Sequence, residues 1–470
     1  MSWPREISLN AWTGSEIPHG QISPEAAIQW AHEGRVDAFS KVLAPGPPAS
    51  LADWRHPEVG WGLILPEAAS SMSWADRALA RDAPKPIQQL LAARPGAPVF
   101  RYLQADGQHV LRRYYPGRPP QDPDLAFSNP GVDVGQVPRY LLICATPLQV
   151  PWSFQSKLNS GSGRYMVGRL HLTGDALGNY IDHLLHEWRG ASARVEQPVV
   201  WATDWGQGDM TRAMRRLIAN PLAAALRGDT QIGDRAWYLD GSTTDASSAA
   251  LLAALVERQP GLVVTTSHGM LGPQHDLDAF ARTLGLPVDN HNQPLDLESI
   301  CSSWAPDGAI WYAHACCSAG SDAPSRLAGL LSQGSNARAA LERTAELGSM
   351  IAPLPSALLG ADKPLRAFVG HVEPTFNWTI QHSLTQQSLA GSIERALYKH
   401  LYQPEPLGLA LRVWYEGIGI RLRDWFKAEE EYTAGRDTEE VALANQLIAY
   451  DRAGTVILGD PTVALPKLPA

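Results

Sequence analysis

The sequence has 470 residues, of which 44% are hydrophobic and 19% are charged. This composition is typical of a globular protein and excludes a disordered, collagen-like or coiled-coil chain. Lys and Arg total 39 against 48 Asp and Glu, which gives a net charge of −9. Because non-specific nucleic-acid binding needs a broad basic surface, we expect no nucleic-acid partner.

The four cysteines are too few and too irregularly spaced for a disulfide framework. The first residues show no charged stretch followed by an apolar one, so we expect no signal peptide. No run approaches the length of about 18 apolar residues that a membrane span needs, so we also expect no membrane association. These features predict a cytoplasmic protein whose thiols stay reduced.

The first part of the chain, residues 1–132, is rich in Pro and Trp, and we expect it to be an N-terminal leader region. Within it, 60–65 predict a short strand and 74–93 predict a helix that prolines interrupt. The stretch 115–124 is rich in Pro, which is typical of turns and linkers. We place the start of the second region, 133–470, after this stretch.

The second region alternates continuous apolar runs with amphipathic segments. The runs that predict buried strands are 140–145, 199–202, 261–266, 309–315, 367–370 and 455–458, and the predicted helices are 175–189, 210–225, 245–257 and most of 391–450. This alternation indicates an α/β fold with a mostly parallel sheet covered on both faces. We expect Thr243 or Thr244 to cap the helix at 245–257, and Asn220 and Pro221 to interrupt the helix at 210–225.

Reactive side chains follow two of the predicted strands. One strand runs into His268 and Gly269, and a later one runs into Cys316 and Cys317. In an open parallel sheet, ligands bind beyond the carboxyl ends of the strands. A thiol and an imidazole at neighbouring strand ends form a potential nucleophile and base, and the backbone N–H groups of Gly269 and of the cysteine could hold an oxyanion.

Each of these residues also has a purely structural interpretation. A His in a turn can serve only to satisfy hydrogen bonds, and a buried Cys is usually an inert, small hydrophobic residue. Structural zinc uses paired ligands at a spacing that the sequence lacks, so we expect no metal and no cofactor. The motifs of zinc proteases, P-loop ATPases and α/β-hydrolases are absent as well.

Short blocks follow one another in a specific order: TSHGM at 266–270, HACCSAGS at 314–321, GHVE at 370–373 and LGDP at 458–461, with YLLICATP at 140–147 before them. Together they resemble the caspase/gingipain superfamily of cysteine peptidases (clan CD), and more narrowly the gingipain-like proteins of bacteria. The resemblance implies a caspase-like α/β sandwich with an N-terminal extension and C-terminal helices. It also implies a His/Cys dyad without an obligatory third member, in which His268 is the general acid and base and the Gly269 N–H is an oxyanion donor.

The resemblance leaves two candidates for the nucleophile. The family blocks place the nucleophilic Cys directly after Ala, which favours Cys316. Many members of the clan instead have Gly three residues after the nucleophile, and Cys317 with Gly320 fits that spacing. We favour Cys316, because the junction of Ala315 and Cys316 lies where the strand should end.

Two further residues are candidates for binding substrate. Asp322 follows the cysteine turn, and its carboxylate could pair with a basic side chain on the substrate residue before the cleaved bond. A solvated turn Asp is the structural alternative. His371 follows an apolar strand and could line the cleft, with a hydrogen-bonded structural His as its alternative.

We therefore expect a cysteine endopeptidase that acts on a protein or peptide substrate. The resemblance to this family implies a regulated protease of bacterial defence or cell-death signalling, with a regulatory protein partner. The alternative is a catalytically inactive caspase-like scaffold that binds partners, and an acyltransferase on the same dyad is a third possibility. The endopeptidase hypothesis requires the sulfur and the imidazole to meet in a groove that solvent can enter.

Overall fold

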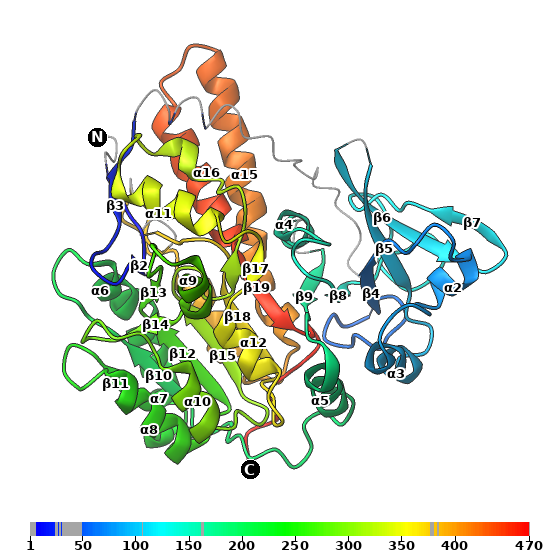
Figure 1. Cartoon of the computed structure of the whole chain (residues 1–470), viewed down its shortest axis with the longest axis horizontal. Helices are drawn as coiled ribbons and strands as arrows, with labels where there is room; N and C mark the ends of the chain where they lie inside the picture. The colour runs from blue at the N-terminus through cyan, green and yellow to red at the C-terminus, as the bar shows by residue number, and fades with distance from the viewer. Residues whose placement is uncertain are drawn as a thin grey trace.

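The computed structural model describes residues 6–23, 27, 30, 49–105, 107–160, 164–376, 380–382 and 385–469. A 12-stranded mixed sheet crosses the molecule (Figure 1). Its strands, in spatial order, are β11 (Trp237–Asp240), β10 (Val199–Ala202), β12 (Leu262–Thr266), β15 (Ile310–His314), β18 (Ala367–His371), β19 (Thr455–Gly459), β9 (Met166–Arg169), β8 (Tyr140–Ile143), β4 (Trp61–Pro66), β5 (Val99–Ala105), β6 (Gln108–Tyr115) and β7 (Arg118–Gln121).

Three small sheets lie outside the large one. They pair β1 (Glu6–Ser8) with β3 (His19–Gln21), β13 (His268–Met270) with β2 (Ala11–Trp12) and β14 (Pro287–Val288), and β16 (Gly320–Ser321) with β17 (Met350–Ile351). The helices are α2 (Trp74–Ala78), α3 (Lys85–Ala93), α4 (Trp152–Ser160), α5 (Gly174–Leu185), α6 (Met210–Met214), α7 (Asn220–Gly228), α8 (Ser248–Arg258), α9 (Leu277–Thr283), α10 (Leu297–Ser303), α11 (Asn336–Ala345), α12 (Pro353–Leu359), α13 (Gly391–Glu394), α14 (Leu407–Ala410), α15 (Arg412–Thr433) and α16 (Glu439–Ala453).

The large sheet is made of two blocks of parallel strands that run in opposite directions. The strands from β11 to β18 are parallel to their neighbours, β19 pairs antiparallel with β18, and the strands from β19 to β5 are again parallel. The expected α/β class with a mostly parallel sheet and C-terminal helices is therefore confirmed. The carboxyl ends of β12, β15 and β18 lie together at one edge, as neighbouring parallel strands require.

The sheet does not stop at the predicted boundary between 1–132 and 133–470. β4, from the first region, pairs in parallel with β8, from the second, and Trp61 lies opposite Tyr140. β4, β5 and the antiparallel strands β6 and β7 extend the sheet on the right of Figure 1, beside α2 and α3. The apolar run of β4 forms a strand because it is buried from Trp61 to Leu65.

Two details of the predicted helices are wrong. α8 begins at Ser248, and its cap is Ser247, whose hydroxyl accepts the Ala250 N–H; Thr243 and Thr244 instead bond to a carbonyl before the helix. The helix that starts at Met210 is not interrupted at Pro221. It passes through one π-helical segment, Arg215–Ala219, and continues directly as α7, in which Pro221 is the second residue.

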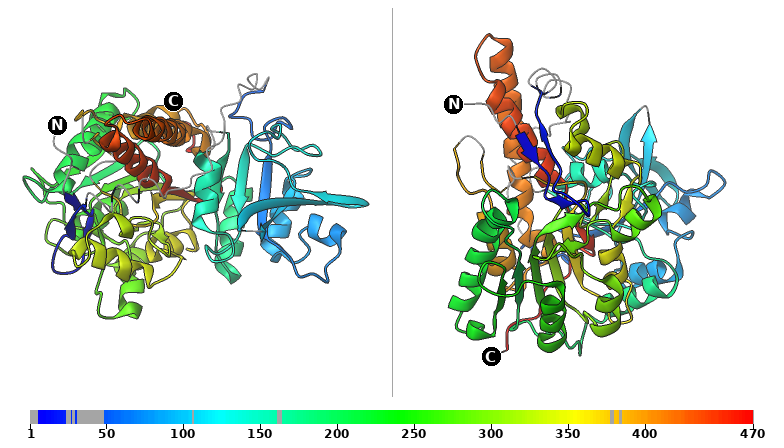
Figure 2. Two further views of the ribbon diagram at one scale, coloured as in Figure 1. Left: turned by 90° about the horizontal axis from the view of Figure 1, so that it is seen from above. Right: turned by 60° about the vertical axis from the view of Figure 1, so that its left-hand side comes forward.

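The long antiparallel pair α15 and α16 forms the upper part of the molecule, as Figure 2 also shows. α16 leads directly into β19, whose residues are all buried. Residues 391–450 are thus mainly helical, as predicted. Within the part of the chain that the structure describes, no helix combines the length and the apolarity that crossing a membrane requires.

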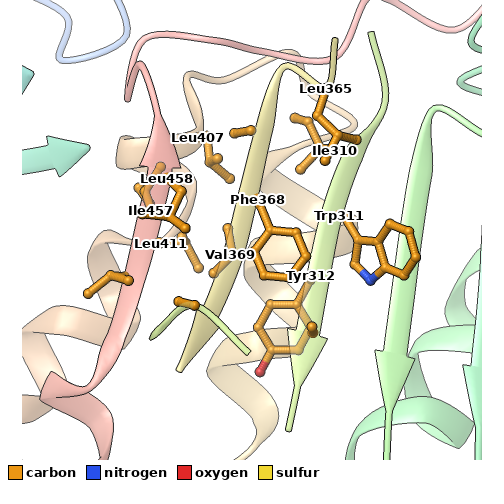
Figure 3. Close-up of a cluster of buried hydrophobic side chains, with 14 of the residues drawn as sticks. Ile310, Trp311, Tyr312, Leu365, Phe368, Val369, Leu407, Leu411, Ile457 and Leu458 are labelled. Carbon is orange, nitrogen blue, oxygen red and sulfur yellow. The ribbon is translucent and has the colours of Figure 1, made fainter. Parts of the chain in front are cut away.

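The core is densest around the middle strands of the sheet. Trp311 of β15, Phe368 of β18 and Leu458 of β19 are almost completely buried. Figure 3 shows Leu458 and Phe368 near Leu407 and Leu411 of the α14 region, and Trp311 on the other side of β15. This packing fixes the strands whose ends carry His268 and Cys316.

Truncation of Phe368 tests this packing. Phe368→Ala should lower the free energy of unfolding by about 3–5 kcal/mol, because it leaves a cavity among buried neighbours. The control Val441→Ala, at a side chain that is 43% exposed, should change it by less than about 0.5 kcal/mol. Urea denaturation of both variants measures the difference, and equal effects would contradict the description of this core.

Candidate active site

The two strand ends that carry the reactive residues are adjacent. β12 and β15 pair in parallel, with Thr266 opposite His314, so the residues that follow them begin side by side. The backbones then come into close contact: a Cβ atom added to Gly269 would lie 2.0 Å from the carbonyl oxygen of Cys316. Only a residue without a side chain fits at 269, which explains the glycine there.

His268 is held by a carboxylate that sequence reasoning missed. Its Nε2 lies 3.2 Å and 3.1 Å from the two carboxylate oxygens of Asp209, which is also the N-cap of α6. Burial favours the neutral form of Asp209, but hydrogen bonds from His268 and Thr211 and the charge of His268 outweigh it, so the pKa of this carboxyl is lowered. The expected dyad therefore has a third polar member.

The other nitrogen of the His268 ring has no hydrogen bond. Nδ1 is buried without a polar partner among the described residues, and the Trp205 ring packs edge-on against the imidazole with a centroid distance of 4.8 Å. With Nε2 fixed by Asp209, Nδ1 is the nitrogen that remains available to accept or donate a proton. A carboxylate that orients a histidine in this way is common in nucleophilic catalysis.

The Cys316 thiol is fixed by the backbone of Thr375. Its Sγ lies 3.2 Å from the Thr375 carbonyl oxygen and 3.1 Å from the Thr375 nitrogen, so the thiol both donates and accepts a hydrogen bond. Burial raises the pKa of this thiol well above its usual range, and the bond from the Thr375 N–H acts in the opposite direction. The buried group is thus held as a thiol.

Cys317 lies in the turn that follows. Its backbone has a left-handed φ of 54°, and its N–H donates to the Glu373 carbonyl at 3.0 Å. Burial, and after it the neighbouring Cys316, raise the pKa of this thiol well above its usual range. The N–H of Cys317 therefore points away from the contact between Gly269 and Cys316.

One carbonyl oxygen joins the two strand ends. The backbone oxygen of Asn10 accepts the Gly269 N–H at 3.0 Å and the Cys316 N–H at 3.3 Å. The N–H of Asn10 donates to the Thr375 carbonyl at 2.9 Å, the same oxygen to which the Cys316 thiol donates. The site thus binds a peptide carbonyl with two backbone N–H groups, one of which belongs to the residue that carries the thiol.

The expected open groove is wrong. His268 and Cys316 are both 0% exposed. One part of the cover is the segment 6–22, which runs beside β13 and α11 (Figure 1) through the pairing of β2 with β13. Trp12 of this segment packs edge-on against Trp205, with a centroid distance of 5.1 Å. The reactive residues are therefore covered in part by a stretch that lies in the expected leader region.

The two predicted substrate-binding residues contact other parts of the molecule. The Asp322 carboxylate accepts a hydrogen bond from the Ser349 hydroxyl at 2.6 Å. The His371 ring contacts the buried His314, with Nε2 3.3 Å from Nδ1 of that residue. Burial lowers the pKa of His371 to about 3. Neither of these contacts involves Asn10, whose carbonyl is bound by the two N–H groups. The contacts therefore give no support to a role of Asp322 or His371 in binding substrate.

The chain matches no model of a known protein family, and no curated protein matches its sequence. Among the described residues, no three His, Cys, Asp or Glu side chains are grouped in a way that could hold a metal ion. What the site offers is a thiol, an imidazole with its carboxylate, and two converging N–H groups.

The variant Asp209→Asn tests the pairing with His268. Asn caps a helix about as well as Asp, so the change removes mainly the carboxylate beside the imidazole. Between pH 5 and 7 we expect the free energy of unfolding to fall by about 1–3 kcal/mol. Because the pKa of Asp209 is lowered in the folded chain, this difference should shrink as the pH falls below about 4, where the carboxyl takes up a proton.

Urea denaturation of both chains at several pH values measures this difference. A constant difference down to pH 2 would show that the carboxylate charge does not interact with His268.

Proposed function

We propose that the protein is a cysteine endopeptidase with Cys316 as its nucleophile. The observation that carries the proposal is the pair of hydrogen bonds from the Gly269 and Cys316 N–H groups to one carbonyl oxygen. An oxyanion hole has to bind the carbonyl at which the nucleophile attacks, so its donors lie next to the nucleophile. Cys316 provides one of these donors itself, whereas the N–H of Cys317 is bonded to Glu373.

In the proposed reaction, the Cys316 sulfur attacks the carbonyl carbon of the scissile peptide bond while His268 takes the thiol proton. The charge on the carbonyl oxygen is stabilised by the two N–H groups. His268 then gives the proton to the leaving amine, and an acyl-enzyme remains. Water hydrolyses this thioester with His268 as the base, which releases the acid and restores the thiol. Asp209 keeps the imidazole in place throughout.

The proposal includes the finer fold assignment, a caspase/gingipain-like sandwich. The order of the two reactive strand ends, His before Cys on adjacent parallel strands, supports it. The four cysteines are free, which fits a reducing compartment such as the cytoplasm. A covered site also fits a regulated protease that a protein partner switches on, as in bacterial defence or cell-death signalling.

A second candidate function is an inactive scaffold that binds partners. The complete burial of both thiols favours it, because a buried thiol with a raised pKa is a poor nucleophile. In that case the segment 6–22 is a permanent part of the core. The two candidates differ in whether the thiol can react once the segment moves.

Matched cysteine variants test the proposal. Cys316→Ala and His268→Ala should each lower the cleavage of a peptide library by about 10³-fold or more, because each removes a reacting group. Cys317→Ala should keep activity within about 10-fold, since this thiol takes no part in the reaction. Cleavage is measured by mass spectrometry on the full chain and on Asn10→Lys, in which a charged side chain replaces one that is buried in the cover.

The opposite pattern, with activity lost in Cys317→Ala and kept in Cys316→Ala, would move the nucleophile to Cys317. Equal activity in the parent chain, Cys316→Ala, His268→Ala and Cys317→Ala would reject the endopeptidase.

A further inference from the structure

Residues 9–12 lie in the site as an extended peptide with partners on both sides. On one side, Leu9 forms an antiparallel bridge with Phe376, and the Asn10 N–H donates to Thr375. On the other side, β2 pairs in parallel with β13, and the Leu271 N–H donates to Trp12. Strand addition of this kind is a common way to bind a peptide.

We propose that this segment occupies the substrate site of the enzyme, and that the site accepts peptides with asparagine before the cleaved bond. The inference rests on the proposed function, and it adds the substrate class and the reason for the closed site. The carbonyl between the two N–H donors belongs to Asn10, so Asn10 takes the position of the residue whose carbonyl is attacked.

The contacts of the Asn10 side chain define the specificity. The side chain is fully buried: its Nδ2 lies 3.3 Å from Sδ of Met214 and 3.4 Å from the carbonyl oxygen of His314, whereas its Oδ1 has no hydrogen-bond partner among the described residues. Both partners are acceptors, so the pocket calls for a donor at this place. An amide nitrogen provides one, whereas an ionised Asp side chain would face two acceptors and lose its hydration.

A basic side chain is also unsuitable. Its charge would be buried against a thioether and a carbonyl, without a carboxylate in these contacts to neutralise it. The carboxylates of Asp204 and Asp240 are already paired with Arg215, at 2.8 Å and 3.1 Å. The contacts of Asn10 therefore favour a neutral amide at this position, and not the basic side chain with which Asp322 was expected to pair.

Two other side chains of the segment, Leu9 and Trp12, also make contacts. Leu9 is completely buried in the cluster that contains Phe376, and Trp12 packs against the same Trp205 that contacts His268. These contacts give the segment its affinity and let it compete with a substrate. We infer that the enzyme acts on other chains only when residues 9–12 leave the site.

The labelling of cysteines by iodoacetamide tests the cover without relying on catalysis. In the full chain, the exposed Cys301 should react and Cys316 should stay protected. In Asn10→Lys, Cys316 should react at least about 10-fold faster, because the charged side chain cannot stay buried and the segment opens. Gln21→Lys, which adds the same charge at an exposed position of the segment, should leave Cys316 protected.

Trp12→Ala tests the cover in a second way, because it removes the ring contact with Trp205 and places no charge in the core. It should also make Cys316 react faster with iodoacetamide. Equal protection of Cys316 in Asn10→Lys, Trp12→Ala and the parent chain would overturn the inference.

The specificity is tested with the peptide ISLNAW, which copies residues 7–12, and with its relatives ISLDAW and ISLKAW. On Asn10→Lys, ISLNAW should protect Cys316 from iodoacetamide at a concentration at least about 10-fold lower than either relative. It should also be cut after its Asn.

Protection by ISLNAW without cleavage would reject the proposed peptidase and would leave only an asparagine-selective peptide-binding site at residues 9–12. Cleavage of the Asp or Lys peptide in preference to ISLNAW would reject the asparagine specificity and leave the peptidase standing.

Discussion

The structure depends on the parallel pairing of β12 with β15. This register sets His268 and Gly269 beside Cys316, and it brings two backbone N–H groups to one point. The contact is so close that residue 269 has no room for a side chain. Backbone groups held by a buried sheet need no reorganisation to bind a carbonyl, which is the physical basis of a preorganised oxyanion hole.

The same geometry explains why the site is closed. Two N–H donors buried together need an acceptor, and in this state the carbonyl oxygen of Asn10 provides it. A peptide that satisfies these donors stabilises the site in the same way as a substrate does. The Cys316 thiol is buried and burial raises its pKa; under the proposed function, these properties belong to a site that the segment covers until substrate binds.

Much of the fold can be predicted from the sequence, because the central strands are continuous apolar runs. The runs at 199–202, 261–266 and 309–315 appear as β10, β12 and β15. β9 was missed because its sequence contains Arg169, which is buried but bonded to Gln155 and to the carbonyl oxygens of Ala145 and Val150. A local pattern cannot show such distant partners.

The site could be predicted only in part, for the same reason. The two reactive strand ends carry local signals, and the parallel order of the strands brings them together. The sequence around Asp209 predicts only a helix cap, and no residue near it indicates a contact with His268. Asn10 lies more than 250 residues before either strand end, so its place between them depends on strand pairing that a single sequence does not reveal.

The most direct test of the central claim is a crystal structure of Asn10→Lys after reaction with a peptidyl acyloxymethyl ketone that carries the sequence ISLN. The account predicts a thioether bond at the Cys316 sulfur and a ketone oxygen bonded to the N–H groups of Gly269 and Cys316. A bond at Cys317, or a ketone oxygen turned away from these two donors, would contradict it.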